Sequence, residues 1–319
     1  MGQMIDGVWR RGDVVPAAGD GAFARKPTVF HHTIAPGTRF APAAGRYHLT
    51  ISLACPWAHR TLIFRKLKGL EDKISISVTH WLMGEDGWNF AAGDGVVPDP
   101  GGATFVHEIY ARADPRYTGR VTVPILWDTR ERTIVNNESA EIIRIFNSAF
   151  DGIGARPGDY YPPALRADID AVNERVYATL NNGVYRAGFA RTQAAYDAAV
   201  VPLFETLDWL EARLARQPML CGNHVTEADI RLFTTLLRFD PVYHGHFKCN
   251  LRRIVDYPNL WDYTRALAQI PGVAETINLD HIKRHYYGSH RHVNPTGIVP
   301  IGPALDFSAA AKRVAVLPG

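Results

Sequence analysis

Two β-like runs with one helical run between them mark the first half of the chain. "RYHLTISLA" (46–54) and "KISISVTH" (73–80) are rich in apolar and β-branched residues, and they predict strands. Between them, "PWAHRTLIFRKLKGL" (56–70) mixes apolar and basic residues in a helical pattern, with Gly69 placed to end the helix. Residues 84–119 are rich in Gly, Asp and Pro, which predicts a long surface loop with a short helix.

The pattern changes character after residue 150. Before it, "VTVPILWD" (121–128) and "RTIVNN" (132–137) predict a hairpin, and "ESAEIIRIFNSAF" (138–150) predicts a helix. A Pro- and Gly-rich stretch, 151–166, follows and is interpreted as a linker. Beyond it, apolar residues recur every three to four positions, which predicts four helices, at 164–182, 192–216, 226–238 and 258–269.

These elements predict two folded parts in a chain of 319 residues. An irregular extension is expected over 1–45, an α/β domain with the order β-α-β-loop-β-β-α over 46–155, and an all-helical domain over 163–319 that ends in an irregular tail.

Composition and charge narrow the possible partners and the cellular compartment of the protein. The formal net charge of +3 is too small and too dispersed to indicate a nucleic-acid partner. Neither a run long enough to cross a bilayer nor the apolar region of a secretory signal is present. The three cysteines show no paired spacing, which disfavours a disulfide framework and favours the reducing cytoplasm.

Cys55 lies at the junction between the first predicted strand and its helix. Helix N-termini stabilise thiolates and lower cysteine pKa values from about 8.5 to roughly 3.5–7.5. Pro56 suits the first helical position because it has no N–H to leave unpaired. Ala58 occupies the second position of a C-x-x-C motif, so an outside thiol must resolve any mixed disulfide of Cys55. In a cytoplasm, that thiol is expected to be glutathione; Cys221 and Cys249 have no such context and are interpreted as structural.

Two further features fit a glutathione site. Pro124 interrupts a strand-like run, and a cis Val123–Pro124 bond would turn the Val123 backbone towards an extended peptide. Glu138 and Ser139 stand at a predicted helix start, where N–H groups bind carboxylates; Glu138 is expected to accept from the ammonium group of glutathione.

The histidines raise the question of a metal. His244, His246 and Cys249 are close in sequence, and His281 and His285 are one helical turn apart. A zinc site needs three or four converging ligands, and "HIKRH" lacks the glutamate of a metalloprotease helix. We therefore expect no metal, with these histidines hydrogen-bonded in helix packing or at a pocket mouth.

The order of elements resembles the glutathione transferase fold, a thioredoxin-like α/β domain followed by an all-α domain. In "VTEADIRLF" (225–233), Thr226 and Asp229 match the internal capping box of the second domain. More narrowly, the chain resembles the glutathionyl-hydroquinone reductases, or Xi-class glutathione transferases. The stretches that carry this resemblance are "GRYHLTISLACPWAHRTLIFRKLKGLE", "GW.F" at 87–90, "VTVPILWD", "NNESAEIIRIFN", "NNGVYRAGFA", "TEADIRLFTTLLRFDPVYHGHFKCN", "HIKRHYYGSH" and "NPTGIVPIGP".

The resemblance implies a role for each matching residue. Cys55 would be the nucleophile, and Tyr185 and Tyr286 would act on the aromatic substrate, with Tyr287 and His290 in the same pocket. Glutathione would be bound by Trp88, Arg120, Val123, Pro124, Glu138 and Ser139. The partners implied are glutathione and aromatic glutathione conjugates, and the family's helical domain implies a homodimer.

Three alternative functions share parts of this pattern. An omega-like thiol transferase or dehydroascorbate reductase uses the same one-cysteine chemistry, but the tyrosine pair Tyr185 and Tyr286 favours aromatic substrates. A non-catalytic module of the same fold has no need of Cys55, Trp88 or the Glu138-Ser139 pair. A storage protein for hydrophobic aromatics would bind them without turnover.

Overall fold

The computed structural model describes residues 2–12 and 19–319 and separates them into two compact units. Among these residues, unit 1 holds 2–12, 26–157 and 278–285, and unit 2 holds 19–25, 158–277 and 286–319. No helix in the described part of the chain has the length and apolar character needed to cross a bilayer.

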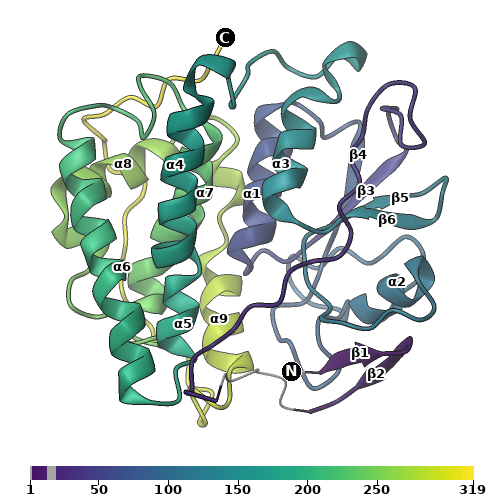
Figure 1. Cartoon of the computed structure of the whole chain (residues 1–319), viewed down its shortest axis with the longest axis horizontal. Coiled ribbons are helices and arrows are strands. Elements are labelled where there is room, and N and C mark those ends of the chain that lie inside the picture. Colours follow the sequence, from purple (N-terminus) through teal and green to yellow (C-terminus); the bar gives the residue numbers. More distant parts are fainter. Residues whose placement is uncertain (1, 13–18) are drawn as a thin grey trace. The chain divides into compact units, whose positions relative to one another are not determined.

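Unit 1 is built on a four-stranded mixed sheet (Figure 1). Its strands are β3 (Tyr47–Ile51), β4 (Ile74–Val78), β5 (Ile125–Asp128) and β6 (Thr133–Asn136), in the spatial order β4-β3-β5-β6. β3 runs parallel to β4 and antiparallel to β5, which pairs antiparallel with β6. The predicted strands and hairpin are confirmed.

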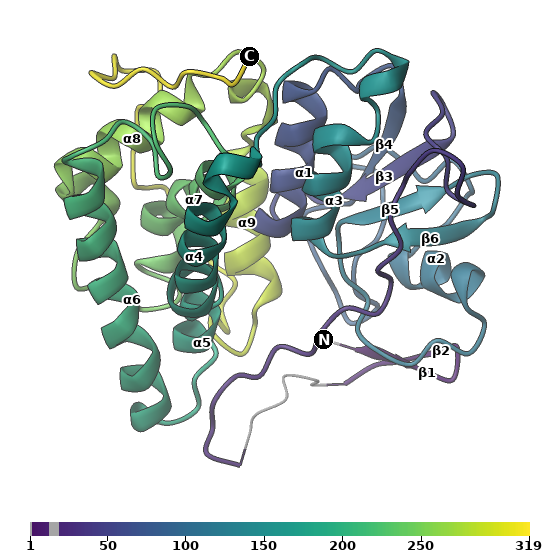
Figure 2. The same ribbon diagram turned by 45° about the horizontal axis from the view of Figure 1, so that its top comes forward.

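Helices cover both faces of this sheet. α1 (Pro56–Leu67) and α3 (Ser139–Ser148) lie on one side and α2 (Val106–Ala113) on the other (Figures 1 and 2). Side chains alternate along β3, so Tyr47, Leu49 and Ile51 share one face, and all three are fully buried.

The N-terminal extension differs from the prediction. Residues 3–10 form an antiparallel hairpin, β1 (Gln3–Ile5) and β2 (Val8–Arg10), and Met4 exchanges backbone hydrogen bonds with Gly119. The sequence held the signal, because Asp6-Gly7 is a preferred two-residue hairpin turn, and both residues have positive φ. At Gly7 a Cβ would stand 1.9 Å from the Pro115 carbonyl oxygen, so only glycine fits. The strands are too short for an alternating pattern to reveal them; residues 1 and 13–18 of the predicted extension lie outside the described residues.

Unit 2 is helical, as predicted. Its helices are α4 (Arg166–Val176), α5 (Gly183–Gly188), α6 (Gln193–Leu214), α7 (Glu227–Arg238) and α8 (Pro258–Ala268). Neither α5 nor α9 (Leu279–Ser289) was among the predicted helices. The division into units passes through α9, whose residues up to His285 count with unit 1. Short 3-10 turns occur at Asp151–Ile153, Pro163–Leu165, Ile254–Asp256 and Ala274–Thr276, and π-helical turns at Tyr177–Asn181 and Phe239–Tyr243.

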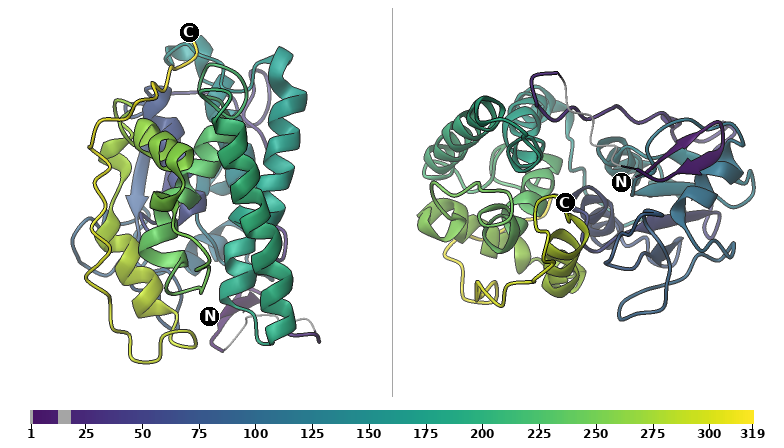
Figure 3. Two further views of the ribbon diagram at one scale, coloured as in Figure 1. Left: turned by 90° about the vertical axis from the view of Figure 1, so that its left-hand side faces the viewer. Right: turned by 90° about the horizontal axis from the view of Figure 1, so that it is seen from below.

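The C-terminal tail is irregular, as predicted, but it is held to unit 2. Figure 3 shows this yellow segment running beside the helices. The Arg313 guanidinium donates to the carbonyls of Gln217 and Pro218, both at 2.7 Å, and the Val225 N–H donates to the Val316 carbonyl at 2.8 Å. The tail therefore satisfies polar groups at the ends of the helices.

A capping box fixes the start of α7, as predicted for Thr226 and Asp229. The Asp229 carboxylate is fully buried and accepts from the Thr226 N–H at 2.7 Å and the Thr226 hydroxyl at 2.9 Å. It also accepts from the Leu220 N–H at 2.8 Å and the Tyr263 hydroxyl at 2.7 Å. Burial raises the pKa of Asp229, and these donors act in the opposite direction. One side chain thus joins α7, α8 and the loop before α7.

We expect Asp229→Asn to lower the free energy of unfolding by about 2–4 kcal/mol, because an amide N–H₂ would then face two buried donors. Asp197→Asn, at an exposed position of α6, is the matched control and should change it by less than about 0.5 kcal/mol. Urea denaturation of both variants measures the difference. Equal stability of Asp229→Asn and the parent would show that this network does not hold unit 2 together.

Candidate active site

The nucleophile candidate lies between the inner strand β3 and helix α1. β3 ends at Ile51, and Cys55 is the N-cap of α1, with Pro56 in the first turn, as predicted. The side chain is 8% exposed, and its thiol donates to the Val123 carbonyl with an Sγ–O distance of 3.6 Å. The Cys55 carbonyl accepts from the His59 N–H and begins the helix. Cys55 therefore lies against the segment that enters β5, with its sulfur at the positive end of α1.

The Val123–Pro124 bond is cis, as predicted. The predicted strand 121–128 is shorter in the structure, because β5 begins only at Ile125. Pro124 has no N–H for the ladder, so it stands just outside the strand. Both Val123 and Pro124 are buried, with the Val123 carbonyl facing Cys55.

Glu138 and Ser139 stand at the start of α3, as predicted. Glu138 is the N-cap, and its Oε1 accepts from the Ala140 N–H at 3.2 Å. The same oxygen accepts from the Ser139 hydroxyl at 3.4 Å. Arg60 of α1 donates to the Ser139 hydroxyl at 3.4 Å, and its guanidinium lies 4.5 Å from the centre of the Trp57 ring. Arg60 therefore links α1 to the start of α3.

The other two predicted glutathione-binding residues also belong to unit 1. Trp88 is buried and stacks on His285, with ring centres 4.6 Å apart. Arg120 is half-buried, and its carbonyl accepts from the Tyr117 hydroxyl at 2.7 Å. All six residues predicted to bind glutathione thus lie in the same unit as Cys55.

The two predicted catalytic tyrosines meet in unit 2. The hydroxyls of Tyr185 on α5 and Tyr286 on α9 are 2.5 Å apart. The Tyr286 hydroxyl also lies 3.1 Å from that of Tyr243. Burial raises the pKa of Tyr286 and of Tyr243 well above the usual value, while Arg238 acts in the opposite direction. Both hydroxyls therefore stay protonated at neutral pH, and the three oxygens form a chain through which a proton can be passed.

Tyr287 and His290 take different positions from Tyr286. His290 is buried, its Nδ1 is 3.3 Å from His246 Nε2, and its ring meets the Tyr286 ring edge-on at 5.3 Å. Tyr287 is half-buried and contacts the His246 ring at 4.7 Å, and burial raises the pKa of its hydroxyl. His290 thus packs directly against Tyr286, whereas the ring contact of Tyr287 is with His246.

Two residues beside the tyrosines were not predicted. Tyr243 ends the π-helical turn Phe239–Tyr243. It lies within "RFDPVYHGHFKCN". A π-turn has no sequence signature, so the position of Tyr243 beside the other two tyrosines was not predicted. Such turns are frequent at functional sites. The Arg25 guanidinium lies 5.0 Å from the Tyr185 ring centre and donates to Asn182 at 2.9 Å. Arg25 comes from the predicted extension, where no sequence pattern indicated it.

The histidines considered as metal ligands are engaged elsewhere. His281 Nε2 lies 2.7 Å from the Asp94 carbonyl, and His285 Nδ1 lies 2.9 Å from the Trp81 carbonyl. Within residues 2–12 and 19–319, no group of three or more His, Cys, Asp or Glu side chains is arranged to hold a metal ion.

The three thiols are free but differ in their surroundings. Cys221 and Cys249 are fully buried, and burial raises the pKa of both. A raised pKa means less thiolate at any pH below it, and only the thiolate is alkylated. Cys55 is buried as well, but it keeps 8% exposure and stands at a helix N-terminus.

We therefore expect iodoacetamide at pH 7 to modify one thiol per native chain, Cys55, at least about tenfold faster than the other two. Peptide mapping after timed alkylation measures the rates, and unfolding in urea should make all three thiols reactive. Modification of Cys221 or Cys249 at the rate of Cys55 in the native protein would contradict this contrast.

Comparisons with known proteins identify the two domains of the chain. The family model described as "Glutathione S-transferase, N-terminal domain" matches residues 54–149, and "Glutathione S-transferase, C-terminal domain" matches residues 193–266. These matches confirm the predicted thioredoxin-like domain followed by an all-α domain.

The relatives are similar over nearly their whole length. The glutathionyl-hydroquinone reductase PcpF of Sphingobium chlorophenolicum is 60% identical over 305 residues, which is 95% of this chain and 97% of that protein. The glutathionyl-hydroquinone reductase YqjG of Escherichia coli K12 is 54% identical over 98% of both chains, and its glutathione-bound structure matches with a TM-score of 0.90 at 51% identity, covering 98% of this chain and 99% of that one. A Xi-class glutathione transferase from Natrialba magadii matches with a TM-score of 0.93 at 48% identity over 99% of this chain and 98% of that one. The chain therefore belongs to the glutathionyl-hydroquinone reductase family, the Xi class of glutathione transferases.

Proposed function

We propose that this protein reduces glutathionyl-hydroquinones to hydroquinones, with glutathione as the reductant. The observation that carries the proposal is the single thiol at the start of α1, Cys55, with Ala58 in the place of a second cysteine. Such a thiol forms a mixed disulfide that only an outside thiol can resolve. The similarity to two glutathionyl-hydroquinone reductases along nearly the whole chain supports this substrate class.

The first step breaks an aryl carbon–sulfur bond. The Cys55 thiolate attacks the glutathionyl sulfur, and the electron pair of the carbon–sulfur bond goes to the ring carbon. An aryl carbanion is a very poor leaving group. If the hydroquinone first shifts to its keto tautomer, the leaving group is instead an enolate, which a proton converts to the hydroquinone. The products are the hydroquinone and a Cys55–glutathione disulfide.

The second step restores the thiol. The thiolate of a second glutathione attacks the glutathionyl sulfur of the mixed disulfide, and Cys55 leaves as thiolate. Overall, the glutathionyl-hydroquinone and one glutathione give the hydroquinone and glutathione disulfide. The conjugate's own glutathionyl group is oxidised together with the incoming thiol, while the ring is reduced, so no other oxidant or reductant is required.

We assign glutathione binding to unit 1. In this assignment, Val123 pairs with the cysteinyl backbone of glutathione beside Cys55, and Pro124 shapes this segment. Glu138 and Ser139 bind the γ-glutamyl end of glutathione. Trp88 packs on the tripeptide, and Arg120 pairs with the carboxylate of glutathione. The contact between Cys55 and the Val123 carbonyl and the helix start at Glu138 support this assignment.

We assign the proton transfers at the phenolic oxygens to Tyr185 and Tyr286. Their hydroxyls share a hydrogen bond, and Tyr243 on the other side can return a proton to Tyr286. A buried, protonated tyrosine hydroxyl donates to one phenolic oxygen as it accepts from another. Tyr287 and His290 are assigned to the walls of the same aromatic pocket.

We further propose that the protein is a cytoplasmic homodimer. The three free thiols suit a reducing compartment. Closed two-fold dimers are the commonest soluble oligomers, and the family resemblance favours the helical unit as the interface. Light scattering of the purified chain measures the oligomeric state directly.

We expect Cys55→Ser to lower glutathione-dependent turnover of glutathionyl-hydroquinone by on the order of 100-fold or more, because a serine hydroxyl is a far weaker nucleophile towards sulfur. The assay follows release of hydroquinone, and Cys249→Ser is the control that should keep activity.

Two other substrates separate the alternatives to this reaction. The parent protein should act weakly on dehydroascorbate and on 1-chloro-2,4-dinitrobenzene in the same assay. Better turnover of dehydroascorbate would favour an omega-like thiol transferase. Binding of glutathione without turnover of any of the three would favour a non-catalytic module, and full activity of Cys55→Ser would exclude the mechanism.

We expect Tyr185→Phe to lower kcat for glutathionyl-hydroquinone by about 100-fold, the usual size of a general acid–base contribution, and to leave glutathione–disulfide exchange within about twofold. Tyr243→Phe should cause a smaller loss in the same direction, because it acts through Tyr286. Tyr196→Phe, whose hydroxyl donates to the Lys248 carbonyl outside the cluster, is the matched control. Equal losses on both substrates for Tyr185→Phe would refute the proton-transfer role.

A further inference from the structure

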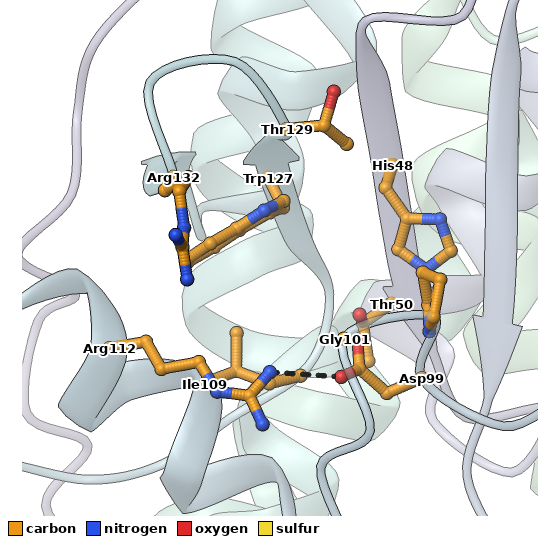
Figure 4. Close-up of a pocket in the computed structure, with 10 residues that line it drawn as sticks. His48, Thr50, Asp99, Gly101, Ile109, Arg112, Trp127, Thr129 and Arg132 are labelled. Atoms are coloured by element: carbon orange, nitrogen blue, oxygen red, sulfur yellow. Dashed lines mark hydrogen bonds and ion pairs between the residues drawn. The ribbon is translucent and has the colours of Figure 1, made fainter.

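Unit 1 contains a cavity on the face of the sheet that carries α2. This cavity has a volume of about 540 Å³ and is lined by residues of β3, β5, α2, the turn after β5 and the segment 99–101. Figure 4 shows Trp127 and Arg132 on one side of it, His48 and Thr50 on another, and Arg112 with Asp99 below. The volume falls within the range that small-molecule sites occupy.

The polar character of this cavity comes from the alternation of β3. Tyr47, Leu49 and Ile51 face the core, so His48 and Thr50 point to the opposite face. The His48 ring is satisfied by two serines of β4, with Nδ1 2.7 Å from the Ser75 hydroxyl and Nε2 2.7 Å from the Ser77 hydroxyl.

The tautomer and charge of the His48 ring follow from these partners. The Ser77 hydroxyl itself donates to the Pro98 carbonyl at 2.9 Å, so His48 Nε2 carries the ring proton. Burial lowers the pKa of His48, against the effect of Asp99. The imidazole is therefore neutral and already paired, and it contributes a wall to the cavity but no charge.

Thr50 is the polar group that the surrounding protein leaves unsatisfied. Its side chain is 1% exposed, and its hydroxyl has no hydrogen-bond partner among the described residues. Leaving a buried hydroxyl unpaired costs about 1–3 kcal/mol. The Thr79 hydroxyl is a second such group among the described residues, but of the two only Thr50 lines this cavity. Thr50 lines the cavity, but its hydroxyl oxygen is covered, so a ligand there reaches the oxygen only after a rotation of the threonine side chain about χ1.

The charges around the cavity favour an anion. Asp99 is compensated, since it accepts from Arg112 at 3.1 Å and from the Ala103 N–H at 2.9 Å. Arg112 also lies 4.0 Å from Glu108, so its charge is shared between two carboxylates. Arg132 is exposed, and within residues 2–12 and 19–319 its guanidinium makes no ion pair or hydrogen bond. One positive charge at the mouth of the cavity is thus left without a counter-charge.

The remaining walls are apolar and partly planar. Ile109 of α2 is buried, and the indole of Trp127 on β5 is half-buried and lines the space. Indole rings offer a flat apolar surface against which an aromatic ring stacks. The cavity therefore combines a planar wall, an unpaired hydroxyl and an uncompensated guanidinium.

We propose that this cavity is a binding site for an aromatic monocarboxylate, separate from the thiol site at Cys55. The ring lies against Trp127 and Ile109, a ring hydroxyl or carboxylate oxygen pairs with Thr50, and the carboxylate meets Arg132 at the mouth. The site does not depend on the proposed reductase activity, because none of its residues takes part in that reaction.

The test is titration calorimetry of the full chain at pH 7, with 4-hydroxybenzoate as the probe and S-methylglutathione present to fill the glutathione site. We expect one saturable site per chain, with Kd on the order of 0.1–1 mM. The neutral analogue 4-hydroxybenzamide should bind at least about fivefold more weakly, because it has no charge for Arg132. Equal binding of the two probes would overturn the assignment of the anion, and no binding of either would overturn the site.

Two pairs of variants place the probe in the cavity. Thr50→Val should weaken binding roughly three- to tenfold, and Arg132→Gln about tenfold. Their matched controls should change affinity less than twofold: Thr79→Val removes another buried, unpartnered hydroxyl outside the cavity, and Arg130→Gln removes an exposed arginine from the same turn. Loss of affinity in Tyr185→Phe with none in Thr50→Val would place the probe in unit 2 and refute the proposal.

Thr50→Val carries a second readout that a purely structural role would not produce. Because the hydroxyl has no partner among the described residues, removing it should leave the urea midpoint unchanged or slightly raised. A clear loss of stability in Thr50→Val would show that the hydroxyl is satisfied within the fold, and this would overturn the argument for a ligand.

Discussion

The constraint on which unit 1 depends is the complete burial of one side of β3. Tyr47, Leu49 and Ile51 have no exposed surface. A slip of one residue would turn these three side chains away from the core, so burial fixes the pairing of β3 with β4 and β5. The end of the strand is then fixed as well, and with it the start of α1 at Cys55. The position of the thiol against the Val123 carbonyl therefore follows from core packing.

The same constraint produces the polar face of the sheet. Once the apolar residues of β3 face α1 and α3, His48 and Thr50 must face α2. Two serines of β4 satisfy His48, but no described residue satisfies Thr50. The alternation of side chains along the five residues of β3 thus accounts for the position of the Cys55 thiol. It also accounts for the polar lining of the cavity on the opposite face of the sheet.

In unit 2 the corresponding constraint is the burial of hydroxyl groups. Tyr185, Tyr243 and Tyr286 are enclosed among aromatic rings, and their hydroxyls satisfy one another. Burial keeps Tyr243 and Tyr286 protonated, so the chain of oxygens holds protons that a phenolic substrate can exchange. The proposed proton transfer therefore depends on the same low-dielectric packing that stabilises the helices.

Local sequence was enough to determine the strand–cysteine–helix junction, the helix start at Glu138 and the capping box at Asp229. Each of these depends on a few neighbouring residues whose backbone preferences are strong. Tertiary structure alone decided that Tyr243 joins Tyr185 and Tyr286, that Arg25 covers the Tyr185 ring, and that Arg132 and Thr50 line one cavity. These contacts join residues far apart in the sequence, and no local preference records them; only the packing of the helices and the pairing of the strands brings them together.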